Sequence, residues 1–212
     1  MGNKLDLDAM TDGLIPVRPL SPAFIHVVAI ALTIGGGAFV VATLGFRDAF
    51  GASGTDPEFL ARSALLIVLA GASLYSAAAM ARPQVGSPHK GWRWALGAAL
   101  VVPVAALIAA LVGQTPLADR LHMNNGIECL AYSIGIGLLL GTVLTGWLRR
   151  GAPTSPERAG TVTGLAAGSL GALAYSMHCP HNDIVYIGLW YTLAIATTTL
   201  LGRLIIPRFI RW

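Results

Sequence analysis

The sequence predicts an all-α, polytopic membrane protein: a bundle of six transmembrane helices with both chain ends in the cytoplasm. Of the 212 residues, 55% are hydrophobic and only 11% are charged, and the mean hydropathy is +0.67. Soluble domains carry about 25% charged residues, so this chain lacks the polar side chains to cover a surface that faces water. The apolar residues also fall into separate segments, each near the ~20 residues that a helix needs to cross a bilayer.

The apolar segments divide the chain into three parts. They run over residues 22–45, 59–81, 94–113, 126–148, 161–178 and 184–206. Residues 1–21 precede this transmembrane domain of residues 22–206, and residues 207–212 form a short cytoplasmic tail. The fifth segment is the least apolar, and its Gly160, Gly164 and Gly168 recur at four-residue spacing. Such small residues let a neighbouring helix backbone approach closely, which favours a buried position for this helix.

Basic residues between the segments predict the orientation in the membrane. One side would carry Lys4, Arg18, Arg82, Lys90, Arg93, Arg149, Arg150, Arg158, Arg203, Arg208 and Arg211, and the other only Arg47, Arg62 and Arg120. Because basic residues accumulate on the cytoplasmic side, both chain ends are expected in the cytoplasm. Arg62 is expected to reach the membrane surface by snorkelling. The basic residues form no single run, so membrane lipid rather than nucleic acid is the expected contact.

Two short segments on the predicted outer side hold an unusual set of side chains. Residues 122–129 and 177–183 contain both cysteines of the chain, three of its five histidines and two of its five methionines. In the oxidising periplasm the two cysteines could form a disulfide, provided that their Cα atoms come within about 7 Å. Thiolate, imidazole and thioether groups equally suit a soft metal ion such as copper, or zinc. The candidate metal ligands are Cys129, Cys179, His178, His181, His122, Met123, Met177 and Glu128. A third alternative is that both thiols are buried and inert.

Several classes of function are disfavoured. No charged residue falls at the midplane of a predicted helix, where a proton-coupled transporter would usually carry one. The chain contains no phosphate-binding loop, nucleophile elbow or metalloprotease helix, and no soluble part exceeds about twenty residues, so the protein is not expected to be an enzyme. A membrane metal transporter or carrier that uses the same Cys, His and Met residues stays as an alternative.

The N-terminal segment is the candidate site for a soluble protein partner. Leu7, Met10 and Leu14 fall at i, i+3 and i+7 and form an apolar stripe on a short helix. A segment of about twenty residues cannot build a core of its own, but it can fold in the groove of a partner. A disordered leader is the alternative. The candidate partner-binding residues are Leu7, Met10, Leu14, Asp6, Asp8, Asp12, Pro16, Val17 and Arg18.

Several of these features occur together in one known family. The acidic and apolar N-terminal segment ends in PVRPL, Cys129 lies in the fourth apolar segment, and AYSMHCP…LWY spans the last two. With six helices, this pattern resembles the NrsF-type family of bacterial inner-membrane anti-sigma factors. The resemblance implies that the N-terminus sequesters an extracytoplasmic-function sigma factor of the SigF type. It also implies that Cys129 and Cys179 sense oxidative or heavy-metal stress and thereby release the sigma factor.

Overall fold

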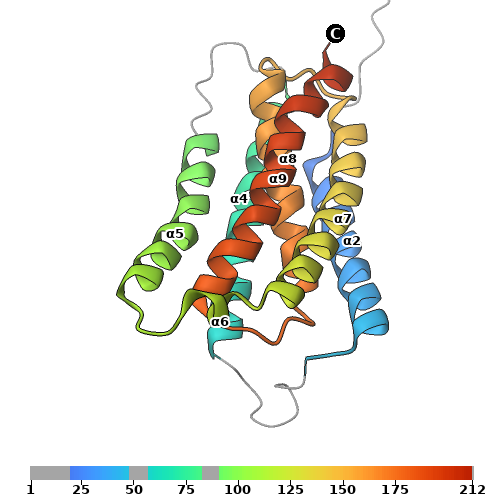
Figure 1. Ribbon diagram of the computed structural model, residues 1–212. Helices are drawn as coiled ribbons and strands as arrows, with labels where there is room; N and C mark the ends of the chain where they lie inside the picture. The colour runs from blue at the N-terminus through green and yellow to red at the C-terminus, as the bar shows by residue number, and fades with distance from the viewer. Residues whose placement is uncertain (1–19, 48–56, 83–90, 212) are drawn as a thin grey trace, which may run out of the picture.

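The structure, a computed structural model that describes residues 20–47, 57–82 and 91–211, consists of helices and the loops between them in these ranges. The helices are α2 (Pro22–Leu44), α4 (Pro57–Met80), α5 (Gly91–Val112), α6 (Leu117–Leu121), α7 (Met123–Leu148), α8 (Pro156–Tyr175) and α9 (Ile184–Ile210). The six long helices lie side by side and are connected at alternate ends of a bundle (Figure 1). The predicted all-α class is confirmed, and each apolar segment corresponds to one long helix.

The start of α8 and the end of α9 differ most from the predicted boundaries, because polar or constrained residues belong to these helices. Helix α8 begins at Pro156 rather than at residue 161, since proline suits the first turn of a helix. Helix α9 continues to Ile210 and passes through Pro207, beyond residue 206 where the last apolar segment was predicted to end. Ile206 and Ile210 are both buried, so the last turn packs on the bundle and stays helical.

Five stretches of the described chain are long and apolar enough to cross a membrane: α2, α4, α5, residues 117–148, and α9. The protein is therefore compatible with a multi-pass membrane protein. Helix α8 does not belong to this set because Gly, Ala, Thr and Ser make it less apolar. It is nevertheless the most enclosed helix, with 16 of its 20 residues buried. Because the other helices surround α8, it needs no apolar face toward lipid, and this explains why it is rich in Gly, Ala, Thr and Ser.

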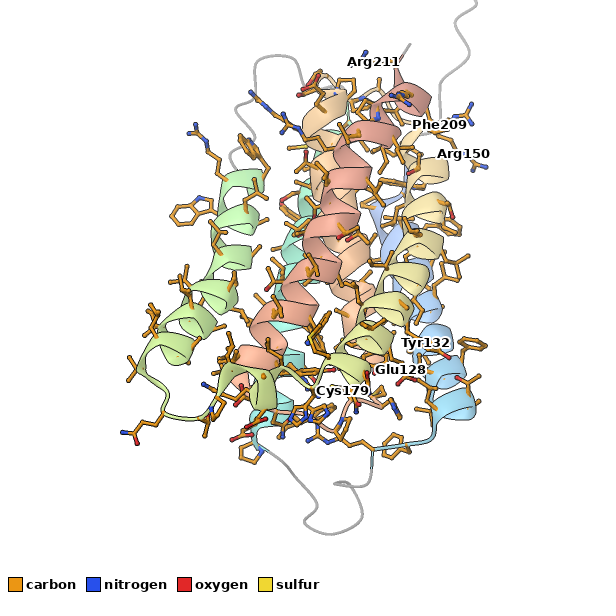
Figure 2. All side chains as sticks on the ribbon, in the orientation of Figure 1. Glu128, Tyr132, Arg150, Cys179, Phe209 and Arg211 are labelled. Carbon is orange, nitrogen blue, oxygen red and sulfur yellow. The ribbon has the colours of Figure 1, made fainter. Side chains whose placement is uncertain are left out.

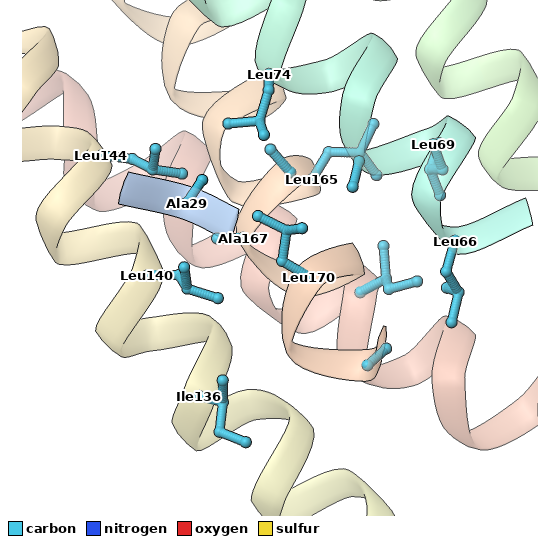
Figure 3. Packing of buried hydrophobic residues seen from close by; sticks show 14 of the residues in the cluster. Ala29, Leu66, Leu69, Leu74, Ile136, Leu140, Leu144, Leu165, Ala167 and Leu170 are labelled. Atoms are coloured by element: carbon cyan, nitrogen blue, oxygen red, sulfur yellow. The ribbon is translucent and has the colours of Figure 1, made fainter. Parts of the chain in front are cut away.

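Small residues allow α8 to occupy the centre of the bundle. A Cβ added to Gly160 would lie 2.6 Å from the carbonyl oxygen of Gly202, and one added to Gly164 would lie 2.5 Å from that of Thr198. The backbones of α8 and α9 are thus in direct contact, as the four-residue glycine spacing predicts. On its other sides α8 packs against leucines of α4 and α7, which Figure 3 shows around Leu165, Ala167 and Leu170.

The two ends of the described chain lie at the same end of the bundle (Figure 1). Leu20 lies beside Gly151, with its Cδ1 atom 3.1 Å from the position of an added Cβ. Arg211 forms an ion pair of 3.6 Å with Glu157. We call this end, with Leu20 and Arg211, the terminal end. The opposite end, which contains Cys129 and Cys179, is the cysteine end.

Candidate functional site

Both cysteines are buried at the cysteine end of the bundle. Cys129 lies near the start of α7, and Cys179 lies in the loop between α8 and α9. Each has 0% of its surface exposed and carries a free thiol. The two thiols interact electrostatically with each other and with the hydroxyl group of Tyr186. The fold therefore brings together two cysteines that are fifty positions apart in the sequence.

Two arginines hold the loop that carries Cys179. Arg62 of α4 donates from Nη1 to the carbonyl oxygen of His181 at 2.7 Å and from Nη2 to that of Ser176 at 3.3 Å. Arg47, which follows α2, donates from Nη1 to the carbonyl oxygen of Cys179 at 3.1 Å. Only 4% of Arg47 and 5% of Arg62 is exposed. The expectation that Arg62 snorkels to the surface is wrong, because the loop carbonyls provide acceptors for its guanidinium group inside the bundle.

The three histidines of residues 122–129 and 177–183 do not all lie together. The rings of His122 and His181 stack with their centroids 4.1 Å apart, and the side-chain amide of Asn125 lies 3.2 Å from Nε2 of His181. Burial, followed by the nearby His122 ring and the charges of Arg47 and Arg62, lowers the pKa of His181. His178 is directed elsewhere, with its Nδ1 atom 3.0 Å from the carbonyl oxygen of Gly45.

The other predicted metal ligands are also dispersed. Met123 is 54% exposed, and Met177 packs beside Gly37 on α2. Glu128 is half-buried and interacts electrostatically with Tyr175. Within residues 20–47, 57–82 and 91–211, no group of three or more His, Cys, Asp or Glu side chains is arranged to hold a metal ion. The eight predicted ligands are therefore not gathered in one group among the described residues, and a metal site built from part of them stays a prediction.

An ion pair fixes the start of α9 beside the cysteine loop. Arg120 of α6 binds Asp183 through Nε at 3.0 Å and through Nη2 at 2.9 Å. Asp183 also caps α9, since its Oδ1 atom accepts from the backbone amides of Val185 and Tyr186. Burial raises the pKa of Asp183, but the hydrogen bonds from Arg120 and the two amides outweigh it and lower this pKa. The ionised carboxylate therefore stabilises the helix start.

Buried tyrosines surround the thiols and were not identified from the sequence. Tyr175, Tyr186 and Tyr191 are each at most 2% exposed. The hydroxyl groups of Tyr186 and of Ser133 on α7 interact with the thiol of Cys129, and those of Tyr186 and Tyr191 interact with that of Cys179. None of the three hydroxyls has a nitrogen or oxygen partner among the described residues. Figure 2 shows Cys179 and Glu128 at one end of the bundle and Arg150 and Arg211 at the other. The cysteine end is thus a buried polar site inside an otherwise apolar bundle.

Comparisons with known proteins agree with the family resemblance. A family model described as negative regulator of sigma F, NrsF, matches residues 10–212. The probable anti-sigma-F factor NrsF of Azospira oryzae is 31% identical over 194 residues, which cover 86% of this chain and 88% of the relative. The anti-sigma-F factor NrsF of Caulobacter vibrioides is 29% identical over 202 residues, 92% of this chain and 93% of the relative. No solved structure matches the chain. Since the family match covers nearly its whole length, the chain belongs to the NrsF family of negative regulators of sigma F.

Proposed function

We propose that this protein is a membrane-bound anti-sigma factor that holds an extracytoplasmic-function sigma factor of the SigF type at the bacterial inner membrane. The family match over residues 10–212 carries this proposal, and the names of the two relatives support it. A protein of this kind acts by binding a transcription factor and not by catalysis. It regulates transcription without contacting nucleic acid itself.

The terminal end of the bundle faces the cytoplasm in this proposal. Its arginines are exposed, namely Arg82, Arg93, Arg149, Arg150, Arg158, Arg208 and Arg211. The arginines of the cysteine end instead bind loop carbonyls or, for Arg120, a carboxylate. Exposed basic residues concentrate on the cytoplasmic side of membrane proteins, which supports this orientation.

The sigma factor binds the N-terminal segment, residues 1–21, in this proposal. Its candidate binding residues, from Asp6 to Arg18, lie outside the described residues. Leu20 is described, and it contacts the connection between α7 and α8 at Gly151. Leu20 therefore meets the bundle at the connection that leads into α8, which begins at Pro156. A displacement of α8 would therefore shift Leu20, the residue at which the binding segment meets the bundle.

A change at Cys129 and Cys179 releases the sigma factor by moving α8. A disulfide would draw the loop after α8 toward α7 and disturb the hydrogen bonds that Arg47 and Arg62 make to that loop. Because α8 contacts α9 through backbone atoms, this close packing would transmit a displacement of α8 along the bundle. Changing a sigma factor from 99% bound to 99% free requires that its free energy of binding become less favourable by about 5.5 kcal/mol. A disulfide contributes about 2–4 kcal/mol, a large part of this requirement.

Expression from a promoter that depends on the sigma factor tests the proposal in cells. It tests both the binding of the sigma factor by the N-terminal segment and its release through the cysteines. Deleting residues 2–19, or replacing Leu7, Met10 and Leu14 by Asp, should give constitutive expression from a protein that still inserts into the membrane. Cys129→Ser and Cys179→Ser should each preserve repression but prevent induction by oxidants. Met123→Leu, a change at an exposed residue in the same segment, is the matched control and should leave induction intact. Repression that survives the N-terminal changes would show that the sigma factor binds elsewhere.

A further inference from the structure

A cavity of about 1090 Å³ opens between α4, α5 and α9. Helix α5 contacts α9 where Ala106 meets Gly188, and it contacts α4 where Gly91 faces Ser76. Of its residues only Ala95 and Ala106 are buried, and Figure 1 shows α5 set apart from the rest of the bundle. Ligand pockets in proteins typically have volumes of about 300–1,000 Å³, so this cavity can hold a sizeable molecule.

The lining of the cavity suits a ligand with a small polar head and a long apolar tail. Its apolar part is formed by leucine and isoleucine side chains that include Leu66, Leu69, Leu100, Leu165, Ile187 and Ile195. At the cysteine end the lining becomes polar and includes Arg62, Asn182 and Tyr191. Arg203 lines the opposite end but is exposed, whereas Arg62 and Tyr191 are buried. A ligand from the membrane would therefore place its polar group at the cysteine end.

The polar end offers two hydrogen-bond donors. The Nε–H group of Arg62 is buried without a partner among the described residues. The hydroxyl group of Tyr191 is buried as well, and the side chain within its hydrogen-bonding reach is that of Cys179. Only 5% of Arg62 and 2% of Tyr191 is exposed, so bulk water does not satisfy these donors. Buried donors are normally paired, which points to an acceptor on a bound molecule.

The acceptor should be neutral. Phosphate groups are usually bound by the fork of an arginine, but both Nη atoms of Arg62 already donate to the carbonyl oxygens of His181 and Ser176. The carboxyl groups of Glu58 and Asp183 also line this end of the cavity and oppose an anion. A neutral carbonyl oxygen fits the unpartnered Nε–H group of Arg62 and the adjacent Tyr191 hydroxyl.

The same polar end adjoins the cysteines. The thiol of Cys179 and Nη1 of Arg62 donate to one acceptor, the carbonyl oxygen of His181, at 3.8 Å and 2.7 Å. The Tyr191 hydroxyl interacts electrostatically with the thiols of Cys179 and Cys129. A carbonyl compound bound at Arg62 and Tyr191 would therefore lie close to the thiol of Cys179, which interacts with that of Cys129.

We propose that the cavity binds a membrane-soluble isoprenoid quinone, with its ring at Arg62 and Tyr191 and its tail along the leucines, and that this quinone oxidises the cysteine pair. The inference rests on the thiol switch of the proposed function and names its oxidant. Two S–H bonds break and one S–S bond forms between Cys129 and Cys179. The two electrons and two protons pass to the carbonyl oxygens of the quinone, which leaves as the quinol. The protein thereby reports the oxidation state of the quinone pool in its own membrane.

Anaerobic oxidation of the purified protein tests the inference. The full chain is reduced, placed in phosphatidylcholine nanodiscs and mixed with decylubiquinone. Alkylation of Cys129 and Cys179 is then followed together with quinone absorbance. We expect loss of both thiols, recovery by reductant, and one quinol formed for each disulfide. Tyr191→Phe should slow the reaction about tenfold, because it removes one donor and retains the ring.

A matched pair of variants examines the cavity itself. Ala61→Phe fills the lining near Arg62, whereas Ala64→Phe adds the same ring to an exposed position of α4 outside the lining. The first change should abolish oxidation by decylubiquinone and the second should leave its rate unchanged. Equal rates for the two variants would overturn the inference. A tightly bound phospholipid that decylubiquinone does not displace would overturn it as well.

A second oxidant separates this inference from the proposed function. Diamide oxidises thiols without needing the cavity, so it should bridge the cysteines in the wild type and in Ala61→Phe alike. If diamide forms the disulfide and decylubiquinone does not, the quinone site is wrong and the thiol switch stands. If neither oxidant forms the disulfide, the switch itself is wrong.

Discussion

The indole ring of Trp190 lies against the bare backbone of Gly126, in space that a Cβ at position 126 would occupy. The indole Nε1 atom donates to the carbonyl oxygen of Leu121 at 2.9 Å, just before α7 begins. One side chain of α9 thus holds the start of α7, where Cys129 lies. This contact, rather than the loops, determines how closely the two helices approach at the cysteine end.

Gly126→Ala should destabilise the protein by about 1–3 kcal/mol, because the added methyl group overlaps the Trp190 ring. Gly135→Ala is the control on the same helix, since an added Cβ at Gly135 meets no atom within 4 Å. The control should be neutral or more stable by up to about 1 kcal/mol, as alanine is the better helix former. Thermal unfolding of the detergent-solubilised proteins measures both changes. Equal midpoints for the two variants would contradict the close contact.

Replacements of Asp183 should separate its two contributions to stability. Asp183→Asn retains a good N-cap for α9 but loses the charge that binds Arg120. Asp183→Ala loses both and should cost a further ~1 kcal/mol, the usual contribution of an N-cap. The ion pair is partly exposed, with 16% and 34% of the two side chains accessible, so its loss in Asp183→Asn should cost no more than about 1 kcal/mol. Thermal unfolding in detergent should give the order wild type, Asn, Ala; if the two variants unfold together, the cap makes no contribution.

Acidification should destabilise the cysteine end through His181. Burial, His122, Arg47 and Arg62 lower the pKa of His181 in the folded protein below its ordinary value of 6.5. The unfolded chain then binds a proton more readily than the folded one, so stability falls as the pH drops below about 6.5 and levels off below the folded pKa. His181→Gln should reduce this slope in a series of unfolding curves. His178→Gln leaves the stacked pair intact and should retain the slope that His181 causes; a wild-type slope in His181→Gln would disprove the assignment.

Reporter fusions should establish the orientation in the membrane. Fusions after Arg150 and Trp212 should show cytoplasmic activity, and fusions near Ser53 and Asn125 should show periplasmic activity, because exposed basic residues favour the cytoplasmic side. A pair of reporters, one active only in the cytoplasm and one only in the periplasm, checks each position twice. Periplasmic activity at Trp212 would place both cysteines in the cytoplasm and remove the proposed mechanism.

The sequence by itself determined the class of the protein, the long helices and the central place of α8. These features depend on local composition: the length of an apolar run matches the bilayer, and the spacing of Gly160, Gly164 and Gly168 matches one helix face. It also placed Cys129 and Cys179 at the same end, because that requires only the number of helices between them. The order of the helices along the chain thus determines which loops and helix ends lie at the same end of the bundle.

Only the tertiary structure decided which side chains meet at that end. Successive side chains of an α-helix point in directions about 100° apart, and a loop can direct neighbouring side chains to opposite sides. Residues that are close in sequence therefore need not be in contact. His178 and His181 flank Cys179 in the chain, yet one lies beside Gly45 and the other stacks on His122. Arg62 turned inward because the loop after α8 offers carbonyl acceptors that no sequence pattern reveals. The cavity beside α5 likewise depends on how far that helix stands from α4 and α9, which is a property of packing and not of any single segment.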